Sequence, residues 1–140
     1  MTYTKVRSYA LAAFVADKGS MDTFGTGIQL DFSKFTDAKY GDAGQRIIPA
    51  GTVVEPTGEN GKPAYLCGPA TGTSGKQAFV LKTAAEEDSK ADALTGYGAY
   101  VGGVVYEALL PDASGSPRVL SAGLKAQLPR FVFMTYGDKR

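Results

Sequence analysis

The sequence predicts a small, mainly β domain with one short helix near the C-terminus and an N-terminal arm. Two segments, residues 46–54 and 100–111, place β-branched residues on both sides of a turn element, the pattern of strand, tight bend and strand. Eighteen glycines and seven prolines exceed average usage, which favours many turns and short strands. Only residues 118–128 combine helical spacing with residues that start and end helices.

The composition is that of one folded domain. A chain of 140 residues can bury a hydrophobic core without metals or disulfides. Its apolar fraction of 44%, with eight Tyr and seven Phe, is typical of folded proteins and not of disordered ones. Fifteen basic and fourteen acidic side chains nearly balance, and the basic ones are scattered, so nucleic acid is not an expected partner.

Residues 1–21 differ from the rest and are predicted to form an N-terminal arm, with residues 22–140 as a single β domain. The apolar side chains of the arm include Tyr3, Val6, Tyr9, Leu11 and Phe14. They fit neither the strand period nor the helical period consistently. Two interpretations remain open: an arm that takes its structure from a partner, or an edge strand or short helix of its own domain.

Three strand signals follow in the first half of the domain. Residues 26–32 alternate between apolar and polar side chains, as in a strand with one buried face. Residues 47–54 predict two strands bent at Pro49, with Gly51 in the turn. In residues 55–63, Asn60-Gly61 favours a type I′ turn and therefore a hairpin.

The strands of the second half contain a pair of glycines. Residues 77–83 predict a buried strand centred on Val80, whereas residues 83–98 fit a helical turn or a loop. Residues 100–110 predict a central strand or pair of strands, in which Gly102 and Gly103 supply a bulge or a close backbone approach.

The chain is predicted to end in a helix followed by a strand. Ser116 and Pro117 are typical of a helix start, and Pro129 ends the helix of residues 118–128. Residues 131–136 form an apolar run that predicts a final strand.

The sequence predicts neither a membrane span nor export. Its longest apolar run, residues 9–16, is far shorter than the roughly twenty residues that cross a bilayer, and no clear signal-peptide cleavage site follows it. Cys67 is the only cysteine, which fits synthesis in a reducing cytoplasm, and we expect it to be a small buried side chain.

No enzyme chemistry is expected, because the sequence contains no complete catalytic or metal-binding motif. Histidine is absent, which removes the commonest general base and metal ligand. Cys67 has no imidazole partner, and nothing places Glu107 and Asp112 in one cleft. We therefore predict no catalytic residues, no metal site and no cofactor.

Two polar segments resemble binding motifs only in part. Residues 70–77 lack the first Gly and the final Ser or Thr of a phosphate-binding loop, so we expect a flexible surface loop. Glu86, Glu87 and Asp88 are adjacent instead of alternating as in an EF-hand, which predicts a solvated acidic loop.

Three tyrosines offer the main competing function. Tyr97, Tyr100 and Tyr106 would be the sugar-binding platform of a small carbohydrate-binding or adhesin module. Tyrosines of β-rich domains are more often core or interface residues, which is the other interpretation of this set.

The order of four segments resembles the lambda-type head decoration proteins of tailed bacteriophages. The segments are IIPAGTVV, AFVLKTAAEED, YVGGVVYEALLP, and a short amphipathic stretch with a final apolar run, between Arg46 and Tyr136. The resemblance lies in their order and spacing, since each segment alone is common in small β domains. The long segment before Arg46 departs from the shorter members of that family.

The resemblance implies a β-clip-like fold and a structural role. A homotrimer would bind the outside of the assembled head and cement neighbouring major capsid protein subunits. The protein would be made in the host cytoplasm and lie on the capsid exterior of the virion. The arm would supply the capsid contacts, through Tyr3, Val6, Tyr9, Leu11 and Phe14.

Overall fold

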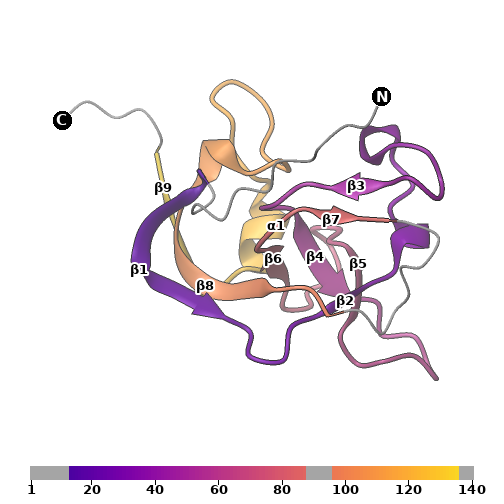
Figure 1. Ribbon diagram of the computed structural model, residues 1–140. Helices are drawn as coiled ribbons and strands as arrows, with labels where there is room; N and C mark the ends of the chain where they lie inside the picture. The colour runs from indigo at the N-terminus through magenta and orange to yellow at the C-terminus, as the bar shows by residue number, and fades with distance from the viewer. Residues whose placement is uncertain (1–12, 88–95, 136–140) are drawn as a thin grey trace, which may run out of the picture.

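The computed structural model describes residues 13–87 and 96–135 (Figure 1). The predicted class is confirmed, because strands predominate and the α-helix of the described part is short and lies near the C-terminus. The strands are β1 Val15–Thr23, β2 Gln29–Leu30, β3 Ile47–Ile48, β4 Val53–Pro56, β5 Leu66–Pro69, β6 Phe79–Leu81, β7 Ala85–Glu86, β8 Ala99–Tyr106 and β9 Phe131–Met134. The helices are the 3-10 turns η1 Phe32–Lys34, η2 Ala38–Tyr40 and η3 Glu107–Leu109, and α1 Ala122–Ala126.

Seven strands form one sheet around β8. The strand order is β1-β8-β6-β4-β5-β2, and β9 runs parallel to β8 from Gly103 to Tyr106. β1 and β9, the first and last strands of the described residues, therefore both lie beside β8, at the left of Figure 1. β3 and β7 form a separate antiparallel pair.

A hydrophobic core lies on each face of the large sheet, because successive residues of a strand point to opposite faces. In β6, Val80 joins one core while Phe79 and Leu81 join the other, and all three are buried. The first core packs against Phe14 and the segment that contains α1. The second packs against η1, η2 and the β3–β7 pair.

The N-terminal arm ends earlier than predicted. Phe14 is only 3% exposed, and its ring meets Tyr100 edge-on at 6.3 Å between centroids. β1 then pairs with β8 from Val15↔Val105 to Thr23↔Tyr100. The predicted boundary at residue 21 is therefore wrong, since residues 14–21 are part of the domain. The other predicted contact residues of the arm, Tyr3, Val6, Tyr9 and Leu11, lie outside the described residues.

The pairing of β1 with β8 contains a bulge in β1. From Asp17↔Val104 to Asp22↔Gly102, β1 advances five positions while β8 advances two. The hydroxyl of Ser20 accepts a hydrogen bond from Val104 N–H at 2.9 Å and donates one to Asp17 O at 2.7 Å. A side chain thus replaces a backbone carbonyl in the ladder, which keeps the amide of Val104 paired.

Gly102 and Gly103 allow the neighbouring backbone to approach β8 closely. Gly103 has a φ of +139°, and a Cβ there would lie 2.4 Å from the sulfur of Met21. A Cβ at Gly102 would lie 2.9 Å from the carbonyl oxygen of Arg130. Of the two alternatives predicted for residues 100–110, the single central strand is correct and the tight bend is not, because β8 passes through both glycines as one strand.

The bend at Pro49 separates strands of two different sheets. β3 pairs with β7, while β4 lies in the large sheet. The carbonyl of Pro49 accepts hydrogen bonds from the amide and hydroxyl of Thr52, which closes the turn. Gly51 has a φ of +90°, and a Cβ there would lie 3.1 Å from the ring of Phe14, so the turn packs against the first core.

The hairpin predicted near Asn60 is present, but its turn is not of type I′. β4 and β5 pair antiparallel across the loop that follows Pro56. A type I′ turn needs a positive φ at both central residues, and the described part has a positive φ only at glycines, among them Gly61. The alternating segment 26–32 likewise forms a shorter strand than expected, β2, although Ile28, Leu30 and Phe32 are buried as the alternation predicts.

The C-terminal helix is shorter than the predicted 118–128. α1 begins after Ser121, whose hydroxyl accepts a hydrogen bond from Leu124 N–H at 3.2 Å, so Ser116 is not the N-cap. A Cβ at Gly123 would lie 1.9 Å from the carbonyl oxygen of Gly72. This glycine therefore lets the helix touch the loop of residues 70–77. No helix in the described ranges is long and apolar enough to cross a membrane.

Candidate functional site

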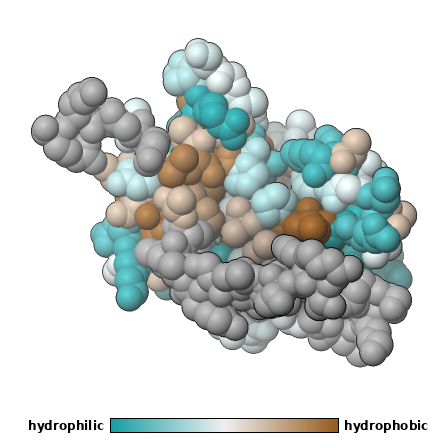
Figure 2. All heavy atoms as spheres, turned by 45° about the horizontal axis from the view of Figure 1, so that its top comes forward, coloured by the Kyte–Doolittle hydropathy of each residue, from teal (hydrophilic) through white to brown (hydrophobic). Residues whose placement is uncertain are grey.

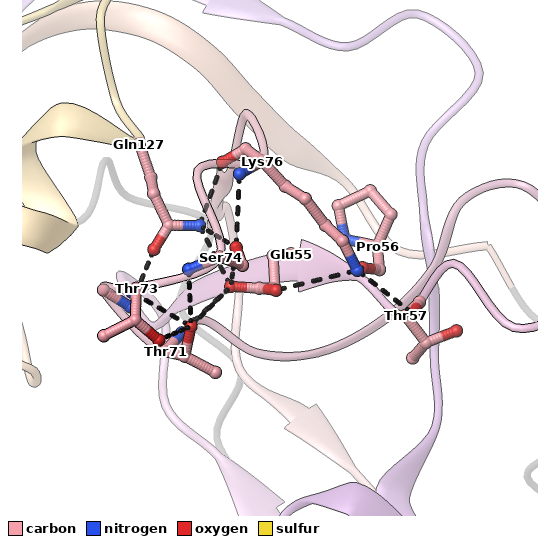
Figure 3. Close-up of polar contacts among 9 residues, drawn as sticks. Glu55, Pro56, Thr57, Thr71, Thr73, Ser74, Lys76 and Gln127 are labelled. Atoms are coloured by element: carbon pink, nitrogen blue, oxygen red, sulfur yellow. Dashed lines mark hydrogen bonds and ion pairs between the residues drawn. The ribbon is translucent and has the colours of Figure 1, made fainter.

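A buried carboxylate organises the polar cluster beside α1 (Figure 3). Glu55 in β4 is 6% exposed, and its Oε1 accepts hydrogen bonds from Thr71 N–H at 2.9 Å, Ser74 Oγ at 3.0 Å and Gln127 Nε2 at 2.9 Å. Its Oε2 lies 4.0 Å from Lys76 Nζ. A buried charge is tolerated when it is hydrogen-bonded and paired in this way. Glu55 is therefore a structural residue.

Gln127, directly after α1, is the second centre of this cluster. Its side chain is almost fully buried, and its Oε1 accepts a hydrogen bond from Gly72 N–H at 2.7 Å. Its Nε2 lies 2.9 Å from three acceptors, Glu55 Oε1, Ser74 Oγ and Lys76 O. The end of α1 is thereby joined to β4 and to the loop between β5 and β6.

The cluster fixes the loop of residues 70–77, which the sequence predicts to be flexible. Besides the amides bound by Glu55 and Gln127, the amides of Thr73 and Ser74 donate to Thr71 Oγ1 at 3.1 Å. The amide of Lys76 donates to Ser74 Oγ at 3.2 Å. A phosphate loop needs such amides free to face the ligand. Since a carboxylate and side-chain oxygens occupy them here, the loop is not built to bind phosphate.

The hydrogen bonds of the cluster also set the ionisation of Glu55. Burial alone would raise its pKa, but hydrogen bonds from Gln127, Thr71 and Ser74, together with the charge of Lys76, lower the pKa below its usual value. Glu55 is consequently an anion near neutral pH and cannot act as a general acid there.

Glu107 and Asp112 stabilise the fold at separate positions. Glu107 Oε2 accepts a hydrogen bond from Leu120 N–H at 2.8 Å and pairs with Lys125 at 2.8 Å. Asp112 Oδ2 accepts a hydrogen bond from Val53 N–H at 2.8 Å. Each carboxylate therefore accepts a hydrogen bond from a backbone amide of a neighbouring segment.

Within the acidic segment of residues 86–88, Glu86 and Glu87 do not lie in a solvated loop as predicted. Glu87 binds the guanidinium of Arg46, with both carboxylate oxygens 3.3 Å from Nη1, and accepts a hydrogen bond from Gly44 N–H at 3.0 Å. Glu86 lies in β7, and Asp88 falls outside the described residues. Within residues 13–87 and 96–135, no three acidic or cysteine side chains are grouped as metal ligands.

Tyr97, Tyr100 and Tyr106 do not form the platform that a carbohydrate-binding module would use. Tyr100 is 4% exposed and belongs to the first core. Tyr97 packs against the second core, where its ring meets Phe32 edge-on at 6.2 Å. The sheet separates these two rings, so a single ligand cannot stack on both.

Cys67 is buried, as predicted. Burial raises the pKa of its thiol to about 12, and the nearby charge of Glu55 adds to the effect. The thiol remains protonated near neutral pH and is a poor nucleophile.

An open groove lies at one end of the second core, against an aromatic cluster. Phe24, Tyr65 and Phe79 contact one another, with the ring centroid of Phe24 4.7 Å from that of Tyr65 and 5.0 Å from that of Phe79. Tyr65 remains 45% exposed. The groove has a volume of about 740 Å³, and its lining comes from β1, β4, β6, β8, the residue before β5 and residues of the adjoining loops.

Polar side chains surround these rings. Asp22 and Arg130 form an exposed ion pair on one side of the groove. Lys76 and Gln77, which follow the fixed loop, line another side. Figure 3 shows how Lys76 is oriented, with its Nζ 3.0 Å from Pro56 O and 3.1 Å from Thr57 O.

No local pattern in the sequence predicts this groove. Its lining residues lie in six separate segments between Asp22 and Arg130 and meet only through the strand order. The one local signal is Tyr65, an aromatic residue that follows a run of turn-forming residues. Side chains at the end of a hairpin are often exposed.

Exposed apolar side chains are also found on β9. The large apolar residues that are well exposed in the described part are Ile47, Tyr65, Val119, Val132 and Met134. On the face shown in Figure 2, brown apolar areas are separated by teal hydrophilic ones. β9 contributes two of the five residues, and Val132 is the most exposed of them at 59%.

Comparisons of the chain with models of protein families, with curated proteins and with solved structures found no match.

Proposed function

We propose that this protein is a bacteriophage head decoration protein, which binds the capsid exterior as a homotrimer and cements neighbouring major capsid protein subunits. The proposal is carried by the four segments that resemble the lambda-type family. These segments form β3–β4, β6–β7, β8–η3, and α1–β9 of one mainly β domain.

The uses of the carboxylates favour a structural protein over an enzyme. Glu55, Glu87, Glu107 and Asp112 each bind backbone amides of neighbouring segments. Histidine is absent from the sequence. A capsid cement needs rigidity and contact surface, and these carboxylates provide rigidity.

We assign the capsid contact to residues 1–12, which precede the first core residue, Phe14. The assigned side chains are Tyr3, Val6, Tyr9 and Leu11, and Phe14 is left out because it fills the core. Twelve extended residues reach about 40 Å at roughly 3.3 Å per residue, enough to contact more than one shell subunit. Strand addition would supply main-chain hydrogen bonds, and burial of the apolar side chains would supply affinity.

The contact between copies in the trimer is assigned to β9. An edge strand with exposed apolar residues tends to associate with another chain unless it is covered. Val132 and Met134 meet that description. Light scattering of the full chain should report a trimer, and Val132→Glu with Met134→Glu should shift it to monomer. A monomer in the unmodified protein at millimolar concentration would remove this part of the proposal.

Two truncations separate an arm from a strand of the domain. Removal of residues 1–12 should abolish co-sedimentation with expanded capsids and leave the melting temperature unchanged. Removal of residues 1–20 should unfold the protein, because it also deletes Phe14 and most of β1. If the protein without residues 1–12 decorates capsids as tightly as the full chain, the assignment of the arm fails.

A further inference from the structure

We infer that the groove between Asp22, Tyr65 and Arg130 is a binding site for a neutral oligosaccharide. This inference goes beyond capsid decoration and does not rest on it. It also differs from the predicted platform of Tyr97, Tyr100 and Tyr106, because the fold places Tyr97 and Tyr100 against different cores.

The first argument is the shape of the groove. Its volume of about 740 Å³ falls within the range of about 300–1,000 Å³ that small-molecule sites occupy. Five strands or their ends contribute to its walls, so the site lies on the rigid part of the fold. It is open along one side, which suits a chain of sugars better than an enclosed ligand.

The second argument is the aromatic ring of Tyr65. Its edge-to-face contact with Phe24 holds the ring in place, while 45% of the residue stays exposed. A pyranose ring has one face of C–H groups, which packs against an aromatic face with little loss of side-chain entropy. A held and exposed ring is the arrangement that such stacking requires.

The third argument is the mixture of polar groups beside that ring. Asp22 offers acceptors, Arg130 offers donors, and Gln77 offers both. A sugar hydroxyl donates one hydrogen bond and accepts others, so adjacent hydroxyls match adjacent donors and acceptors. A polyproline segment also binds aromatic grooves, but its backbone supplies only acceptors and would offer no further donor to Asp22 beyond Arg130.

The charges around the groove favour a neutral ligand. Asp22 is paired with Arg130, and the ammonium group of Lys76 lies 4.0 Å from Glu55 Oε2 and donates to two backbone carbonyls. No charge among these residues is left for an anionic sugar or a phosphate. Lys76 is also held through its backbone carbonyl by Gln127 at 2.9 Å, so this side of the groove is formed before a ligand binds.

The test is a titration of the full chain with defined probes. Maltohexaose, cellohexaose and chitohexaose are each added to the protein in calorimetry and in two-dimensional NMR, and a proline decapeptide is the competing probe. We expect at least one hexasaccharide to bind with a Kd of about 1 mM or tighter and to shift the amide signals of Phe24, Tyr65 and Gln77.

Variants then locate the site. Tyr65→Ala should weaken binding at least about tenfold, whereas Tyr65→Phe should keep most of it, because stacking needs the ring and not the hydroxyl. Ile47→Ala, at a residue 52% exposed on β3, is the matched control and should bind within about twofold of the unmodified protein. Asp22→Asn is a second variant at an exposed position, to be used if Tyr65→Ala does not fold.

The inference is overturned if none of the three hexasaccharides binds, if Tyr65→Ala and Asp22→Asn bind as well as the unmodified protein, or if only the proline peptide binds. Capsid co-sedimentation of Tyr65→Ala is measured in parallel and should be unchanged. A loss of sugar binding without a loss of decoration separates this inference from the proposed function.

Discussion

Gln127 Nε2 lies 2.9 Å from Glu55 Oε1, although 72 residues separate the two in the chain. This contact joins the end of α1 to β4. Both side chains also form hydrogen bonds with the loop of residues 70–77. Both side chains are buried. If a substitution removes one of them, water cannot take its place as hydrogen-bond partner of the other without rearrangement of the fold.

Glu55→Gln is expected to destabilise the protein by about 2–3 kcal/mol, because it removes the charge that strengthens the three hydrogen bonds at Oε1 and places an amide NH2 group beside Lys76 Nζ. Chemical denaturation measures the free energy of unfolding. Glu59→Gln is the control, since Glu59 forms an exposed pair with Lys34 and should contribute less than about 1 kcal/mol. Equal effects of the two substitutions would contradict the role of Glu55.

The same carboxylate predicts a dependence of stability on pH. The folded-state pKa of Glu55 is lowered, so its charge stabilises the fold above the unfolded-state pKa of about 4.5, and this contribution is lost as the pH falls through the folded-state value. The difference in unfolding free energy between the unmodified protein and Glu55→Gln should shrink from pH 7 toward pH 3. A constant difference over that range would show that Glu55 is not stabilised as an anion.

Gly102→Val and Gly103→Val should each destabilise the protein by about 1–3 kcal/mol or more, because β-branched side chains would collide with Arg130 and Met21. Gly96→Val is the control, since a Cβ at Gly96 meets nothing within 4 Å. Thermal unfolding monitored by circular dichroism distinguishes them. An unchanged melting temperature in both strand variants would contradict the close approach of the backbone.

Phe14→Ala should cost about 3–5 kcal/mol, the usual loss for a buried phenylalanine. Tyr3→Ala should leave the free energy of unfolding unchanged and weaken capsid binding, because Tyr3 is assigned to the capsid contact. If both substitutions lower the free energy of unfolding by the same amount, the boundary between the arm and the domain does not lie at residues 12–14.

The sequence predicted the strands where a single local signal dominates. The apolar run around Val80 is buried as expected, and Ile28, Leu30 and Phe32 alternate as expected. These features depend on neighbouring residues only, so local patterns are sufficient to find them.

The errors occurred where distant segments decide the structure. Residues 14–21 have no clear period, and their strand forms because β8 lies beside them and because a bulge lets Ser20 complete the ladder. The helix begins after Ser121, and its Gly123 lies against the backbone of Gly72, a distant contact that spacing alone cannot indicate. The groove is assembled from six segments, so its composition is not visible in any one of them.

The most direct test of the proposed function is cryo-electron microscopy of expanded, undecorated capsids mixed with the purified full chain. The capsids are assembled from the major capsid protein of the genome that encodes this chain. We expect trimeric density on the capsid exterior at three-fold positions, and loss of that density with the protein that lacks residues 1–12. Bare capsids at a saturating concentration of the folded full chain would contradict the account.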